Sequence, residues 1–106
     1  MNNKTIAAAQ QFNEERFTKV DIIKNRRSVA FLLNFLPEQH MKPHDHPGRE
    51  LFLCVIEGSG TLLIDGKESP VTKGDVIYCG PKEQIGFTNT SELNVSIYAT
   101  MTKIAD

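Results

Sequence analysis

The feature that most limits the fold is an alternation of short apolar runs with turn residues from residue 17 onward. The apolar runs are residues 28–36, 51–56, 61–64, 76–79, 84–88 and 93–101. Nearly every gap contains glycine or proline, and Asp65-Gly66 is a strong signal for a two-residue hairpin turn. No segment after residue 16 keeps the apolar period of about 3.6 residues that is typical of an amphipathic helix. The pattern therefore predicts an all-β sandwich or barrel.

The length of the chain supports one domain. With 106 residues and 40% hydrophobic content, it has enough apolar surface for one small core. We expect this domain over residues 17–106, preceded by an arm or short helix over residues 1–16. Residues 51–56 are apolar at consecutive positions, which indicates a strand that is buried on both faces. One face would line the barrel and the other would contact a second sheet, the arm or another subunit, so we expect a homodimer.

Charge and hydropathy argue against two kinds of partner. Twelve basic and thirteen acidic residues give a formal net charge of -1, whereas a duplex-binding protein normally carries a basic face. No apolar run approaches the ~20 residues of a membrane span, and no apolar signal core follows residues 1–4. We expect a cytoplasmic protein that binds neither nucleic acid nor membrane. Cys54 and Cys79 lie in apolar runs, and we expect buried free thiols because lone disulfides are rare in a reducing compartment.

Residues 43–50 read Pro-His-Asp-His-Pro-Gly-Arg-Glu and hold two of the three histidines of the chain. Residues i and i+2 of an extended strand point to the same face, so His44 and His46 would direct both imidazoles to one point. Glu50, four residues after His46, would return to that point. Two neutral imidazoles and one carboxylate leave open positions on Fe(II), Mn(II), Ni(II) or Zn(II). The octapeptide therefore predicts a site for a divalent metal ion.

Together with the strand pattern, these residues resemble the cupins, a family of small jelly-roll β-barrels (double-stranded β-helices) that often hold one metal ion. The resemblance covers roughly residues 28–101. The segment from His44 to Gly58 resembles the first cupin motif in its histidines and its Glu-Gly ending. Residues 74–89 resemble the second motif in length and in their Gly-Asp, Pro and Asn landmarks. The resemblance implies a jelly-roll barrel that binds a divalent metal ion and a small organic molecule.

Two departures from the cupin pattern concern the metal ligands. The family usually has a histidine four residues before the Asn of the second motif, and this chain has Ile85 there. The neighbouring Gln84 would offer an amide oxygen only if the strand shifted by one residue. The family also has six residues between its Glu ligand and the glycine, whereas seven separate Glu50 from Gly58. Counting back from the glycine places Leu51 in the ligand position, so Glu50 is a ligand only if a β-bulge absorbs the extra residue.

The interior of such a barrel would form an apolar pocket beside the histidines. Its expected lining is Phe52, Tyr78, Ile85, Phe87 and the inward side of residues 93–101. His40 has the same parity as His44, but four residues of extended strand span about 13 Å, whereas ligands lie about 2 Å from a shared ion. We therefore expect His40 at the surface or rim. No residue is assigned as catalytic.

Two classes of function stay open. The first is a metal-dependent oxygenase or isomerase, in which His44, His46 and Glu50 hold an ion that binds O₂ or polarises a substrate oxygen. The second is a non-catalytic barrel, a small-ligand-binding or accessory protein in which Ile85 has replaced a metal ligand with apolar lining. Whether the protein is an enzyme is left open, because barrels of this kind serve many unrelated activities.

Overall fold

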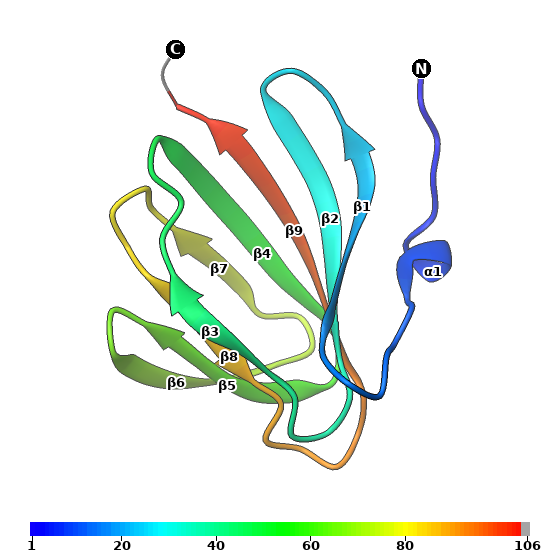
Figure 1. The fold of residues 1–106 in the computed structure, drawn as a ribbon, viewed down its shortest axis with the longest axis vertical. Coiled ribbons are helices and arrows are strands. Elements are labelled where there is room, and N and C mark those ends of the chain that lie inside the picture. Colours follow the sequence, from blue (N-terminus) through cyan, green and yellow to red (C-terminus); the bar gives the residue numbers. More distant parts are fainter. Residues whose placement is uncertain (105–106) are drawn as a thin grey trace.

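The computed structural model of the protein describes residues 1–104, and its regular structure is almost entirely β-strand (Figure 1). Within these residues, one short helix precedes nine strands. The elements are α1 (Ile6–Ala9), β1 (Thr18–Lys24), β2 (Ser28–Phe35), β3 (His40–His44), β4 (Arg49–Glu57), β5 (Ser59–Ile64), β6 (Lys67–Thr72), β7 (Val76–Cys79), β8 (Ile85–Thr88) and β9 (Val95–Lys103). The predicted all-β fold is confirmed, and the short helix expected in the N-terminal segment is present.

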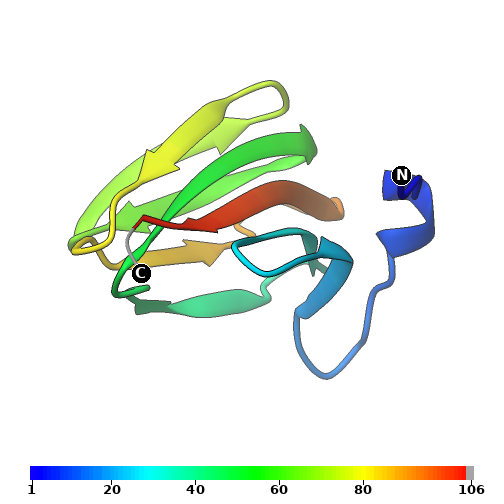
Figure 2. The same ribbon diagram turned by 90° about the horizontal axis from the view of Figure 1, so that it is seen from above.

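The strands form two antiparallel sheets that face each other. The five-stranded sheet has the order β1-β2-β9-β4-β7, and the four-stranded sheet has the order β3-β8-β5-β6. Neighbours in space are often distant in sequence, since β9 lies between β2 and β4. Figure 2 shows the two layers from above, with α1 outside them on the side of β1. This arrangement is a jelly-roll barrel, as expected.

Alternation along the strands decides which side chains form the core. In β4, Leu51, Leu53 and Val55 are each at most 2% exposed and belong to the core between the sheets, whereas the residues between them face outward. From the two sheets, Phe35 and Phe87 meet in this core with their ring centroids 4.8 Å apart. The core therefore lies between the two sheets.

The N-terminal arm covers part of the outer face of the five-stranded sheet. Leu32 and Asn34 are fully buried although they alternate with inward-facing residues of β2. The side-chain amide of Asn34 donates to the carbonyl of Ala9 at 2.9 Å, and its oxygen accepts from the hydroxyl of Ser96 at 2.8 Å. Burial on both faces holds for β2, because the arm is bonded to it. For residues 51–56 the expectation of burial on both faces was wrong, since Phe52 on the outer face of β4 is 52% exposed.

The expectation of buried thiols holds for one of the two cysteines. Cys79 is a fully buried free thiol, but Cys54 is only half-buried, because it points to the outer face of β4. Within residues 1–104, no helix is long and apolar enough to span a membrane.

Candidate functional site

The two histidines of the octapeptide lie side by side. His44 ends β3, and His46 follows in the loop before β4. Their rings meet edge to face with centroids 4.6 Å apart. The Nδ1 atom of His44 lies 2.8 Å from the carbonyl oxygen of Lys42. Because a carbonyl only accepts, this Nδ1 carries a proton and donates it to the carbonyl.

His46 holds the most unusual polar atom of the site. Its Nδ1 is buried and has no hydrogen-bond partner among the described residues. Burial of the ring, followed by the neighbouring His44, lowers the pKa of His46 below its ordinary value of 6.5, so the imidazole is neutral at neutral pH. A buried polar atom without a partner costs about 1–3 kcal/mol, which a bound molecule recovers by bonding to it.

A cavity of about 90 Å³ opens beside these histidines, and we call it the inner cavity. Its lining consists of Phe17, Lys19, Phe31, Leu33, Met41, His44, His46, Leu51, Leu53 and Ile85. Apart from the histidines and one lysine, every lining side chain is apolar. An apolar cavity of about 150 Å³ holds benzene, so the inner cavity has room for a group smaller than a benzene ring.

Two hydrocarbon side chains occupy the positions where the resemblance placed metal ligands. Ile85 is fully buried and lies opposite His44 across the β3–β8 pair. Leu51 is 2% exposed and lines the inner cavity. Counting back from Gly58 placed Leu51 on the inward face of the strand, and Leu51 does face inward in the structure.

Glu50, the expected third ligand, does not join the histidines. It lies on the outer face of β4, where its carboxylate accepts a hydrogen bond of 2.8 Å from the Tyr78 hydroxyl. A bulge does interrupt β4, between Val55 and Glu57, but it leaves Glu50 facing outward. The extra residue lies instead in the turn after His46, which the Arg49 amide closes by donating to the His46 carbonyl at 3.0 Å.

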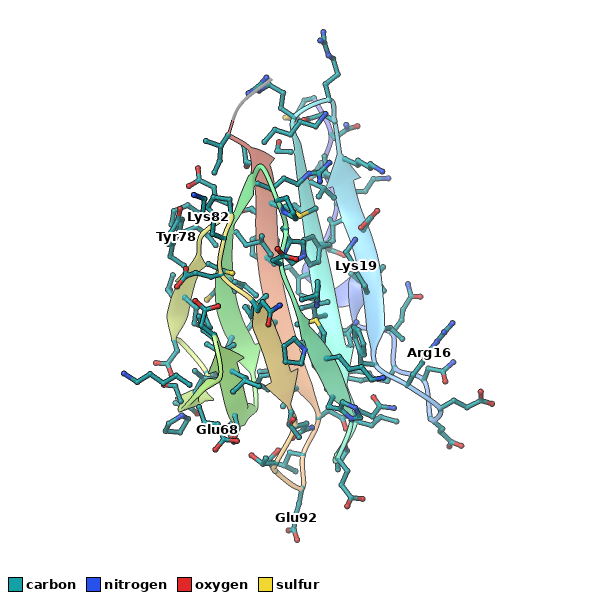
Figure 3. The ribbon with its side chains drawn as sticks, turned by 60° about the vertical axis from the view of Figure 1, so that its left-hand side comes forward. Arg16, Lys19, Glu68, Tyr78, Lys82 and Glu92 are labelled. Carbon is teal, nitrogen blue, oxygen red and sulfur yellow. The ribbon has the colours of Figure 1, made fainter. Side chains whose placement is uncertain are left out.

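The expected pocket residues divide into two groups. Ile85 lines the inner cavity, and Phe87 is 2% exposed in the core. Phe52 and Tyr78 instead face outward and are 52% and 47% exposed, so their assignment to the pocket is corrected. Figure 3 shows Tyr78 at the outer margin of the ribbon, on the opposite side from Lys19. Cys79, next to Tyr78, points inward instead, as does Ile77 in the same strand.

The donors around the histidine pair do not complete a metal site. Across residues 1–104, no three or more His, Cys, Asp or Glu side chains are grouped so that they could hold a metal ion. Even catalytic metal sites with open positions normally use three protein ligands. His40, which begins β3 at an exposed position, does not line the inner cavity. The residues present therefore do not fit a metal ion held by the protein alone.

Sequence reasoning missed the part of the site that β1 supplies. The Lys19 ammonium lies 3.0 Å from the Asp21 carboxylate and 4.5 Å from the centroid of the Phe31 ring. Phe17, just before β1, stacks on Phe35 with centroids 5.1 Å apart. The alternation of charged and apolar residues from Lys19 to Lys24 is the signal that would have identified this strand.

Comparisons with known proteins identify the family and the fold. A family model described as the cupin domain matches residues 31–101. An uncharacterized protein of Aquifex aeolicus is 28% identical over 95 residues, which are 87% of this chain and 77% of that protein. The crystal structure of the TT1209 protein of Thermus thermophilus has a TM-score of 0.91 at 20% identity, over 97% of this chain and 98% of that one. The structure of KdgF from Halomonas sp. has a TM-score of 0.82 at 14% identity, over 100% and 97% of the two chains. At these identities, the two structures show a shared fold alone.

Proposed function

The chain belongs to the cupin domain family, and from this premise we propose that it is a non-catalytic barrel that binds a small organic molecule beside His44 and His46. The observation that carries the proposal is that His46, whose buried Nδ1 lacks a hydrogen-bond partner among the described residues, lines a cavity that is otherwise mainly apolar. A hydroxyl group both donates and accepts, so it bonds to this nitrogen in either tautomer.

The lining supports binding rather than metal chemistry. Leu51 and Ile85 place hydrocarbon where a metal site needs donors, and they extend the apolar surface that a bound molecule contacts. Ligand sites in proteins combine mostly apolar walls with a few polar groups that orient the ligand. His44 and His46 are polar groups of this kind, because both line the same cavity.

A metal-assisted site is the second candidate, favoured by the 4.6 Å between the imidazole rings. Two imidazoles alone form an incomplete ligand set, so a divalent ion (Fe, Mn, Ni or Zn) would need further donors from the bound molecule. This candidate predicts that metal ion and small molecule bind together, and an oxygenase or isomerase would need both.

The proposal is tested by nuclear magnetic resonance with isobutanol, a branched alcohol whose four-carbon alkyl group is smaller than a benzene ring. Titration to about 100 mM is needed, because a ligand of so few atoms binds in the millimolar range. We expect shifts of the His46 ring nitrogens and of the Leu53 and Ile85 methyl groups. His46→Leu removes one hydrogen bond and weakens binding about threefold to tenfold, whereas His40→Leu is the matched control and leaves it unchanged.

Two outcomes contradict the proposal. The first is a folded protein whose His46 and Leu53 signals stay unchanged at the highest isobutanol concentration. The second is tight Ni(II) binding by the protein alone that His44→Ala abolishes, since this shows that a metal ion is held without a small molecule.

A further inference from the structure

A second cavity, of about 220 Å³, is lined mainly by basic side chains, and we call it the basic cavity. Its cations are Lys19, Lys24, Arg26, Arg27, Arg49 and Lys103, which are half of the twelve basic residues of the chain. Asp21 is the one carboxylate among its described lining residues. In a chain with a net charge of -1, this segregation concentrates positive potential at one place.

The basic cavity continues the inner face of the five-stranded sheet. Arg49 lies two residues before Leu51 in β4, and Lys103 lies two residues after Met101 in β9, so both keep the inward parity of the core. Figure 1 shows the β1–β2 turn, the end of β9 and the start of β4 together at one end of the barrel. The apolar interior thus changes into a basic surface toward this end.

The positions of the cations favour an anion between them. Arg49 and Lys103 are directly opposite each other in the β4–β9 pair, and like charges at such positions repel each other. Within residues 1–104, Lys24, Arg26, Arg49 and Lys103 form no ion pair, and Lys19 pairs with Asp21. A bound anion would relieve the repulsion and pair with the cations.

The basic cavity adjoins the inner cavity, because Lys19 lines both. A single molecule that extends past Lys19 would occupy both cavities. The inner cavity, at about 90 Å³, accepts only a short apolar group, whereas the basic cavity, at about 220 Å³, accepts a larger charged one. The guanidinium of Arg27 donates to the backbone carbonyl of Lys103 at 3.3 Å, which holds the Arg27 side chain at the end of β9.

We propose that the ligand is a small amphipathic dianion, with its charged group in the basic cavity and a short apolar group beside His44 and His46. This inference rests on the proposed function and names the class of ligand. A phosphate monoester or a dicarboxylate with a branched alkyl group has this chemistry. Guanidinium and ammonium groups bind such oxygens through charge-assisted hydrogen bonds.

The test compares isobutyl phosphate, isobutylmalonate, isobutanol and inorganic phosphate, titrated calorimetrically into the protein at low ionic strength. We expect one or both dianions to bind about tenfold or more tightly than isobutanol and than inorganic phosphate, because each places its two ends in two cavities. The stronger of the two dianions identifies phosphate or dicarboxylate as the charged group.

Charge-neutralising variants locate the charged group. Arg49→Gln and Lys103→Gln should each weaken dianion binding about fivefold or more and leave isobutanol binding unchanged, since the side-chain charge alone is removed. Lys82→Gln is the matched control, because Lys82 is exposed and does not line the basic cavity. It should leave every affinity unchanged.

The inference fails while the proposed function stands if isobutanol shifts the His46 signals but neither dianion binds more tightly than isobutanol. It also fails if inorganic phosphate binds as tightly as isobutyl phosphate, because the anion site then works independently of the inner cavity. Equal weakening by Arg49→Gln and Lys82→Gln would indicate general charge screening and overturn it as well.

Discussion

At the scale of single residues, the chemistry of the site depends on which of two neighbours faces inward. Leu51 lines the inner cavity, and Glu50 bonds to Tyr78 on the outer face. A shift of one residue in register would exchange the inward and outward faces along the whole strand. The extra residue in the turn after His46 therefore leaves hydrocarbon, and not a carboxylate, beside the imidazoles.

This parity predicts that Leu51→Glu creates the ligand set that the chain lacks. The new carboxylate would be buried beside His44 and His46, so we expect a loss of several kcal/mol in the free energy of unfolding without metal. Zn(II) should restore much of this loss, because a bound ion pairs the charge and stabilises the folded state. Thermal unfolding with Zn(II) and with a chelator measures both effects.

Phe52→Glu is the control for this experiment, because it adds the same charge one residue further along β4 on the exposed face. It should show no response to Zn(II). Ile85→His is the milder test of the same geometry if Leu51→Glu does not fold, and it should also raise Zn(II) affinity. Zn(II) affinities that stay equal to that of the unmodified protein in both cavity variants would contradict the placement of the site.

At the scale of elements, the N-terminal arm is held to the sheet by polar contacts around Asn34. Its side chain is fully buried and bonds to Ala9 and Ser96. Asn34→Ala leaves the Ala9 carbonyl and the Ser96 hydroxyl without this partner, so we expect the free energy of unfolding to fall by about 1–3 kcal/mol. Urea unfolding measures the change.

Asn94→Ala is the matched control, since Asn94 is exposed in the turn before β9. Its effect should stay within about 0.5 kcal/mol. A loss of the same size in both variants would show that the arm contributes nothing through Asn34.

The elements also show how far the sequence determines the fold. Apolar runs and turn residues predicted β4, β5, β7, β8 and β9 closely, because each strand alternates or is buried on both faces. The strand β1 was missed, since its charged residues face the rim. The strand β3 begins at His40 and contains Pro43, which removes a backbone donor and weakens any strand signal. The order of strands in the sheets was not predicted, because the runs do not determine it and the family resemblance implied only a jelly-roll barrel.

The candidate site was predictable only in part, because local patterns determine some of its contacts and the complete topology determines the others. The spacing of His44 and His46 was enough to bring the rings together, because the relation is local. The face of Glu50 depended on where the chain absorbs one residue, which local patterns do not determine. The basic cavity joins residues from β1, β2, β4 and β9 and therefore depends on the complete topology.

At the scale of the whole molecule, the outer face of the five-stranded sheet is covered over one half and uncovered over the other. The arm covers the half near β2, where Leu32 is fully buried. Over β4 and β7 the outer face instead carries Phe52, Val76 and Tyr78, which are 52%, 69% and 47% exposed. The rings of Phe52 and Tyr78 are 5.1 Å apart and form one continuous aromatic surface.

The homodimer expected from the sequence stays a prediction, and we propose that two copies meet on this uncovered half. The strand β7 is the edge of its sheet, so one side of its backbone has no strand partner among residues 1–104. Exposed apolar edge strands pair readily with another chain, and a second copy offers the same edge in antiparallel orientation through two-fold symmetry.

Val76→Lys places a charge at this edge and should shift the dimer to monomer, which light scattering coupled to size-exclusion chromatography measures at about 10–100 µM protein. The control is Leu93→Lys, since Leu93 is 72% exposed in the turn before β9, away from β7. It adds the same charge and should leave the dimer intact. A wild-type protein that is monomeric at the highest concentration contradicts the prediction of a dimer. A dimer that survives Val76→Lys but not Leu93→Lys places the contact on another surface.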